Sequence, residues 1–194
     1  MTTATSRLLD VKNLPQEQTY TCDDGTTIDV REFVEDHRPA IEALAAHGKI
    51  KDTENFGFAM AAPQFGESVI SLNWDKPEEF VWFVGGWGPK RLQCIANAVR
   101  KLRPLLRTGF YSTLDLRRFA PQEFDNPVPS FDANGTFPWG DFARGGGVVV
   151  QMCELLLPGA VSCLKETEDD TVTRLILGNF AAKIVAGNKL LPNN

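Results

Sequence analysis

The feature that most constrains the fold is an order of elements that occurs on both sides of a long loop. Residues 56–75 and 147–165 each hold short apolar segments interrupted by a turn, and a helical pattern follows each region. Short apolar segments bounded by turn residues predict β-hairpins. Residues 78–88, apolar and aromatic, predict a third strand or a strand-to-helix turn. Together with an early helix, this order predicts an α+β fold in which helices cover one antiparallel sheet.

Helix signals mark three regions. Asp29 and Glu32 have the spacing of a capping box and predict a helix that Pro39 kinks or divides in two, with Gly48 at its end. A second helix is expected from Pro89, with Pro104 breaking or bending it near Leu102. Its apolar residues recur at steps of three and four: Leu92, Ile95, Ala96, Val99, Leu102 and Leu106. A third helix is expected after the acid-rich segment 166–170.

The chain divides into a short arm and one domain. Residues 1–27 have little periodicity and are interpreted as an N-terminal arm, and residues 28–190 as a single domain. Within the domain, residues 119–141 form a long loop whose prolines exclude regular structure and whose aromatic residues predict packing.

Composition narrows the function classes. The chain has 194 residues, 43% of them hydrophobic, and a net charge of −5, which argues against nucleic-acid binding. It lacks both a run of about 20 apolar residues and the pattern of a secretory signal, so no membrane partner and a cytoplasmic location are expected. Its four cysteines form no C-x-x-C pair and are predicted to be reduced thiols. Only His37 and His47 are present, so no metal site is expected.

Three consecutive glycines directly precede the apolar strand Val148–Val150, although glycine weakens strand interiors. Two interpretations stay open for Gly145, Gly146 and Gly147. They form either a tight turn that feeds a buried strand, or a surface where a ligand approaches the backbone beside the cation of Arg144. In the second interpretation, the acid-rich segment 166–170 orients Arg144 by charge pairing.

The candidate site residues support three hypotheses. A ligand-binding protein would hold an anion with Arg144, Lys90 and the amides of Gly145, Gly146 and Gly147, against an aromatic wall. The wall comprises Trp82, Trp87, Trp139 and Phe142. A cofactor-independent isomerase, lyase or cyclase acting on a small acidic or aromatic metabolite would use Glu154, Asp169 or Tyr111 for proton transfer. An oligomeric scaffold or chaperone-linked protein would use the arm and the aromatic loop as interaction surfaces.

Residues 29–75, 90–113 and 142–170 resemble the GlcG/HbpS-like proteins, the haem-degrading domain family, and in particular an uncharacterised branch of small proteins with that fold. The most distinctive stretch is the glycine turn with its strand and acid-rich helix. The resemblance implies a profilin-like or PAS-like sandwich, a homo-oligomer and a small-molecule or haem-type ligand. The chain departs from the family at Leu164–Glu166, where a small-residue turn is usual, and at Arg144, because a guanidinium cannot coordinate haem iron as a histidine there would.

Overall fold

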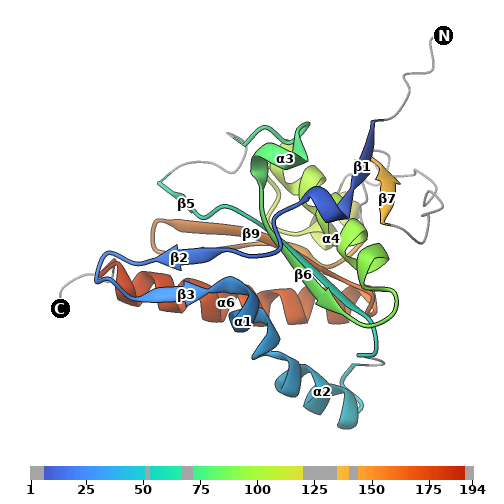
Figure 1. Cartoon of the computed structure of the whole chain (residues 1–194), viewed down its shortest axis with the longest axis horizontal. Coiled ribbons are helices and arrows are strands. Elements are labelled where there is room, and N and C mark those ends of the chain that lie inside the picture. The colour runs from blue at the N-terminus through green and yellow to red at the C-terminus, as the bar shows by residue number, and fades with distance from the viewer. Residues whose placement is uncertain (1–6, 51–52, 67–71, 120–134, 140–143, 191–194) are drawn as a thin grey trace.

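The centre of the chain is a five-stranded antiparallel sheet (Figure 1). The computed structural model describes residues 7–50, 53–66, 72–119, 135–139 and 144–190. The strands of this sheet are β4 (Phe56–Ala61), β5 (Gln64–Phe65), β6 (Val81–Trp87), β8 (Gly147–Met152) and β9 (Leu155–Ser162). β8 pairs with one edge of β9, β4 and β5 pair with its other edge, and β6 lies beyond β4.

The two long helices cover opposite faces of the sheet. Successive side chains of a strand point to opposite faces. Accordingly, Phe56, Phe58 and Met60 of β4 lie in one core cluster with α6 (Glu166–Gly187), whereas Ala59 and Ala61 lie in another with α4 (Arg91–Thr108). This helix–sheet–helix arrangement confirms the predicted α+β class with an antiparallel sheet and packed helices.

Helix α4 runs through Pro104 without a break, unlike the interruption expected near Leu102. Leu102, Leu105 and Leu106 around the proline are fully buried against the sheet. Burial of each such side chain stabilises the fold by about 2 kcal/mol. The three leucines together therefore outweigh the cost of about 3 kcal/mol for a proline inside a helix. Tertiary packing therefore keeps the helix continuous.

Residues 7–27 belong to the domain rather than to a separate arm. They form β1 (Leu8–Asp10), the short 3-10 helix η1 (Val11–Asn13) and β2 (Thr19–Thr21). β1 pairs with β7 (Thr136–Pro138), and β2 pairs with β3 (Thr27–Asp29). A boundary after residue 27 would cut the second of these pairs, and it would separate the buried side chains of Val11, Leu14 and Cys22 from the cores they complete.

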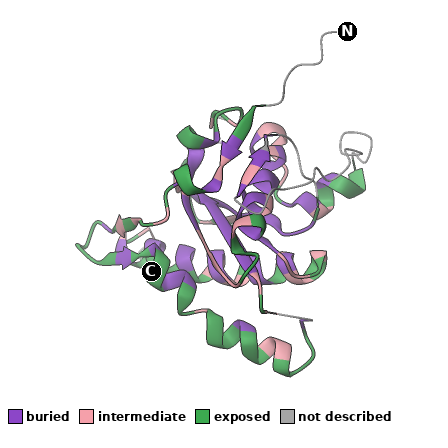
Figure 2. Cartoon of the chain, turned by 45° about the vertical axis from the view of Figure 1, so that its right-hand side comes forward, coloured by how far each residue is buried: buried purple, intermediate pink, exposed green. Residues whose placement is uncertain are grey.

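The first predicted helix is two helices, as Pro39 indicates. α1 (Val30–Glu35) is capped by Asp29, whose carboxylate accepts from the backbone N–H of Glu32 at 2.9 Å, and α2 (Arg38–Ala46) follows with Pro39 in its first turn. Figure 2 shows α2 as the lower, mainly exposed helix. The remaining short helices are α3 (Pro77–Phe80) and α5 (Thr113–Phe119).

Two predicted loops differ from expectation. Residues 64–66, expected to be the turn of a hairpin with β4, instead contribute β5, which pairs with β9. Of the expected second strand 67–75, residues 67–71 lie outside the described residues and residues 72–75 form no strand. In the predicted loop 119–141, Phe119 ends α5, and β7 buries Phe137. Segments 120–134 and 140–143, which include Phe142, lie outside the described residues.

A substitution at Gly57 tests the close contact between β4 and α4. A Cβ there would collide with the backbone of Cys94 and Ile95 and lie 2.6 Å from the Cys94 Cβ. We expect Gly57→Ala to lower the free energy of unfolding in urea by about 1–3 kcal/mol, the usual cost of overpacking. The matched control is Gly178→Ala in α6, where nothing lies within 4 Å. It should raise stability by about 0.5–1 kcal/mol. Equal effects of both variants would contradict the contact.

Candidate functional site

A buried ion pair joins the two long helices. Lys101 of α4 and Asp169 of α6 are 1% and 3% exposed, and the ammonium Nζ lies 2.8 Å from Oδ2 of the carboxylate. Lys101 also donates to the carbonyl of Val161 on β9 at 2.8 Å, and the backbone N–H of Leu164 donates to Oδ1 of Asp169 at 3.0 Å. Both charges are thus hydrogen-bonded, as burial of an ion pair requires.

Burial dominates the pKa of both partners. Desolvation raises the pKa of Asp169 from 3.8 to about 6, against the opposing effects of the Lys101 charge and hydrogen bond. Desolvation also lowers the pKa of Lys101 below its usual value, and Asp169 partly offsets this effect. The low dielectric of the site disfavours both charged forms more than the partners stabilise them.

The glycine turn packs against this pair, and every one of its glycines is sterically required. A Cβ on Gly145 would lie 2.6 Å from the carbonyl oxygen of Glu166, and one on Gly146 would lie 2.6 Å from that of Val161. A Cβ on Gly147 would lie 2.7 Å from Cγ2 of Thr113. Only Gly146 has a positive φ, +106°. The third glycine, which a turn alone does not explain, is thus explained by its close packing on Thr113.

Hydrogen bonds hold the turn in place. The hydroxyl of Thr113 accepts from the N–H of Gly147 at 3.0 Å and donates to the carbonyl of Arg144 at 2.8 Å. The hydroxyl of Thr173 lies 2.8 Å from the carbonyl of Gly146, which also accepts from Val161 N at 3.0 Å. These bonds fix the backbone from which the Arg144 side chain extends.

A cavity of about 530 Å³ lies over the ion pair, and we call it the glycine-turn cavity. Its wall combines the end of β9, the start of α6 and two positions of α4. The lining residues are Asn97, Lys101, Arg144, Ser162, Cys163, Leu164, Lys165, Glu166 and Asp169. Of the residues predicted for a site, Arg144 and Asp169 therefore meet at one cavity, and the glycine turn packs beside them.

Arg144 is an accessible cation of this cavity. Its side chain is 59% exposed and lies 3.7 Å from Oε1 of Glu166, which is an ion pair but beyond hydrogen-bonding distance. Glu166 is engaged more closely by Arg117, at 2.5 Å from Oε2. The predicted charge pairing of Arg144 with the start of the last helix is present in this loose form, and among the described residues the guanidinium donates no hydrogen bond.

A disulfide between Cys94 and Cys163 forms part of the same region. This corrects the prediction of four reduced thiols, since only Cys22 and Cys153 are free. The two bonded residues are 69 positions apart in the chain, and they meet because α4 packs on β4 beside the end of β9. No spacing pattern in the sequence predicts this pair.

The other predicted site residues do not join the cavity. Glu154 lies in the β8–β9 turn, and Lys90 precedes α4 with its backbone N–H donating to Asn55. Tyr111 is 50% exposed, and its hydroxyl donates to the side chain of Gln151 at 3.2 Å. These three residues are not among those that line the glycine-turn cavity.

The predicted aromatic wall is divided between the faces of the sheet. Trp87 stacks on Phe56 at 4.1 Å between ring centroids, and Trp82 packs near Phe180, both with the α6-side core. Trp139 packs near Phe80 in the α4-side core. Because the sheet separates these cores, Trp82 and Trp87 do not share a wall with Trp139.

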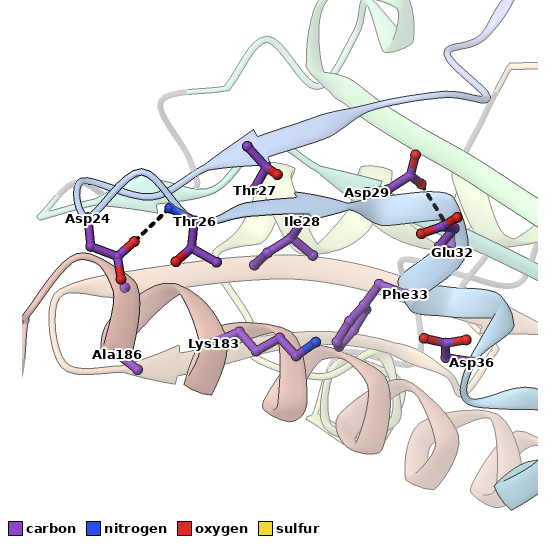
Figure 3. A pocket seen from close by; sticks show the side chains of 11 residues that line it. Asp24, Thr26, Thr27, Ile28, Asp29, Glu32, Phe33, Asp36, Lys183 and Ala186 are labelled. Atoms are coloured by element: carbon purple, nitrogen blue, oxygen red, sulfur yellow. Dashed lines mark hydrogen bonds between the residues drawn. The ribbon is translucent and has the colours of Figure 1, made fainter.

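A second cavity, of about 460 Å³, lies between the C-terminal part of α6 and the β3–α1 segment (Figure 3). Four acids line it: Asp24, Asp29, Glu32 and Asp36. Lys183 lies opposite them, with its ammonium 5.0 Å from the ring centroid of Phe33. We call it the acidic groove. Its lining carries an excess of negative charge.

The histidines offer no cluster for a metal ion. Nδ1 of His37 lies 2.8 Å from the carbonyl of Phe33, and its Nε2 lies 3.0 Å from the amide of Asn179. Within the described ranges, no group of three or more His, Cys, Asp or Glu side chains is arranged to hold a metal ion.

Comparison of the chain with protein-family models, curated proteins and solved structures finds no significant match. The GlcG/HbpS-like resemblance therefore stays a prediction. None of the helices in the described part of the chain is both long enough and apolar enough to cross a membrane.

The titration of Asp169 tests the buried pair. We expect its carboxyl carbon to titrate near pH 6 by NMR, because burial raises its pKa from 3.8 to about 6. Because the folded state favours the protonated carboxyl group, this group stabilises the fold fully below pH 3.8. The stabilisation is lost as the pH rises through about 6 and the group ionises. This loss amounts to about 3 kcal/mol. Asp24 is the internal control, since its pKa is lowered by hydrogen bonds from Thr26. A midpoint for Asp169 at or below that of Asp24 would contradict the assignment.

Proposed function

We propose that this chain binds a small carboxylic acid in the glycine-turn cavity and that Arg144 holds the carboxylate. The observation that carries this proposal is an exposed guanidinium at the edge of a cavity of about 530 Å³, 3.7 Å from its ion-pair partner. A guanidinium presents paired donors whose geometry matches a carboxylate, and two parallel charge-assisted hydrogen bonds give both affinity and orientation.

The charges of the cavity support an anionic ligand. Its lining holds three cations, Lys101, Arg144 and Lys165, and two anions, Glu166 and Asp169. Lys101 and Asp169 neutralise each other, and Glu166 is bound by Arg117 from α5. Lys165, 63% exposed, lies 3.9 Å from Glu168 and adds a second accessible cation. The lining residues therefore carry one net positive charge, although the whole chain carries a net charge of −5.

Asn97 suggests a second feature of the ligand. Its Oδ1 is buried and has no hydrogen-bond partner within the described part of the chain, and the residue belongs to the cavity wall. A buried acceptor without a partner costs about 1–3 kcal/mol, so a ligand N–H that reached it would gain affinity. The favoured ligand thus combines a carboxylate with a hydrogen-bond donor, as an acylated amino acid does.

A small acid fits this cavity better than haem does. Neither histidine lines the cavity, and Cys163 is engaged in a disulfide rather than available as a thiolate. A haem-type ligand, which the family resemblance implies, would need an axial ligand from another residue.

The enzyme hypothesis is a second candidate, and the raised pKa of Asp169 is the observation in its favour. Both oxygens of Asp169, however, already accept hydrogen bonds, from Lys101 and from Leu164. Proton transfer to a substrate would have to displace one of these bonds. Ligand binding without proton transfer by Asp169 is therefore the proposal that the geometry supports better.

Binding of N-acetylglycine tests the proposed function, because this probe combines a carboxylate with an amide N–H. We expect it to shift the NMR signals of Asn97, Arg144 and the three glycines, whereas neutral N-acetylglycinamide should not. Arg144→Ala should weaken binding about tenfold or more, since a charged hydrogen bond contributes about 1.5–3 kcal/mol. Lys183→Ala is the matched control, because it removes one positive charge from the acidic groove and should leave affinity unchanged.

Two results would contradict the proposal. One is equal binding of the acid and the amide. The other is a loss of affinity in Lys183→Ala that matches the loss in Arg144→Ala.

A homo-oligomer is also proposed, from the family resemblance, and large apolar residues are available on the surface for contacts between copies. Leu8 and Phe119 are each 66% exposed, and Tyr111 and Phe65 are 50% and 40% exposed. We expect sedimentation velocity at micromolar concentration to detect a species larger than the 21.5 kDa chain. A single monomeric species would contradict this proposal and with it the scaffold alternative. The cytoplasmic location stays a prediction from sequence.

A further inference from the structure

We infer that the glycine-turn cavity is a thiol–disulfide exchange site, at which a small acidic thiol forms a mixed disulfide with Cys163. The inference rests on the proposed function, since it assigns the bound carboxylic acid to a chemical class, the low-molecular-weight thiols. It also gives a role to the disulfide between Cys94 and Cys163, which carboxylate binding alone does not use.

The two halves of this disulfide differ in accessibility. Cys94 is fully buried in α4, where Gly57 of β4 packs directly against it, and it does not line the cavity. Cys163 is half-buried and belongs to the cavity wall, directly after β9. A thiolate that enters from solvent therefore meets the disulfide from the side of Cys163.

The backbone at Cys163 has an unusual conformation. Cys163 has a φ of +92°, in a region that residues with a side chain rarely adopt. Residues held in such conformations cluster at active sites and ligand-binding sites.

The exchange step is balanced without a further oxidant or reductant. The thiolate of the small molecule attacks the sulfur of Cys163, a new S–S bond forms, and the bond between Cys94 and Cys163 breaks. Cys94 leaves as a thiolate and takes up one proton, which balances the proton that the small thiol lost when it ionised. Cys94 is the fourth residue of α4, so it lies in the first turn, where the helix dipole stabilises negative charge on sulfur.

Charge selects among thiols. Arg144 and Lys165 are the accessible cations of the lining, while the Glu166 carboxylate is bound by Arg117 and the Asp169 carboxylate by Lys101. A thiol with a carboxylate would be held by Arg144 with its sulfur near the wall that contains Cys163. A thiol of the same shape without the charge would lack this anchor.

The experiment compares N-acetylcysteine with N-acetylcysteine amide at equal thiolate concentration. It uses the full oxidised chain with Cys153→Ser, which removes the exposed free thiol. After an acid quench, mass spectrometry should find one adduct per chain, on Cys163, and a free thiol at Cys94. We expect the acid to react about tenfold faster than the amide, a ratio that one charge-assisted contact supplies. The ratio should fall to about one in Arg144→Ala and persist in Lys183→Ala.

In the first variant, Cys94 can attack the mixed disulfide and restore the original bond, so a missing adduct could reflect this reversal. A second variant without Cys94 removes that possibility. In Cys94→Ser with Cys153→Ser, Cys163 is a free thiol, and the disulfide of N-acetylcysteine should form a stable adduct on it with the same dependence on Arg144. An unmodified chain in both variants, an adduct on Cys94, or equal rates for acid and amide would overturn the inference. If N-acetylglycine still binds in that case, the proposed function survives. If it does not bind, both proposals fail.

Discussion

The buried ion pair between Lys101 and Asp169 is the interaction on which the arrangement around the cavity depends. It links two helices that cover opposite faces of the sheet, and the pair lies beside the last residues of β9. Such a connection needs room at the sheet's end, and the glycine turn supplies it, since a Cβ on Gly146 would lie 3.0 Å from the Lys101 ammonium and would collide with Asp169. Gly146 is thus required by the ion pair itself, and Gly145 and Gly147 by the packing around it. Removing one partner of a buried pair costs about 3–5 kcal/mol, so any loss at this point would also disorganise the cavity wall.

The two cavities lie toward opposite ends of α6 and differ in charge. The glycine-turn cavity includes Glu166 and Asp169 at the N-terminal end, and the acidic groove includes Lys183 and Gly187 near the C-terminal end. From Asp169 to Lys183 the helix rises by about 20 Å. The helix dipole favours anions at the N-terminal end and cations at the C-terminal end. The lining charges of the two cavities favour the same ions at the same ends. A single helix therefore contributes to one cavity with a net positive lining and to another with a net negative lining.

Sequence patterns predicted the local elements of this fold much better than its long-range contacts. Asp29, Pro39 and the three helical patterns act within a few residues, so the elements they predict are found in the structure. Lys101 was missed, although Ala98 and Leu105, its neighbours at helical spacing, are fully buried and mark it as a charge within an apolar surface. Its partner lies 68 residues away, and the disulfide joins residues 69 apart. Hydrophobic periodicity does not encode such pairs. The same limit explains why the predicted aromatic wall was wrong. Nothing local in the sequence distinguishes Trp87 from Trp139, yet the two lie on opposite faces of the sheet.

The disulfide connects the state of the cavity to the redox conditions around the chain. A cytoplasm keeps most thiols reduced, whereas oxidising compartments preserve disulfides, so the predicted cytoplasmic location and the Cys94–Cys163 bond favour different states of the same site. In the oxidised state the bond ties α4 to the segment between β9 and α6, and this segment carries Leu164, Lys165 and Glu166 of the cavity wall. In the reduced state the ion pair, the hydrogen bond from Lys101 to Val161 and the hydrogen bond from Leu164 to Asp169 would still link the elements at this junction. Exchange at Cys163 would therefore change the wall that faces the ligand while the buried pair keeps the helices in place.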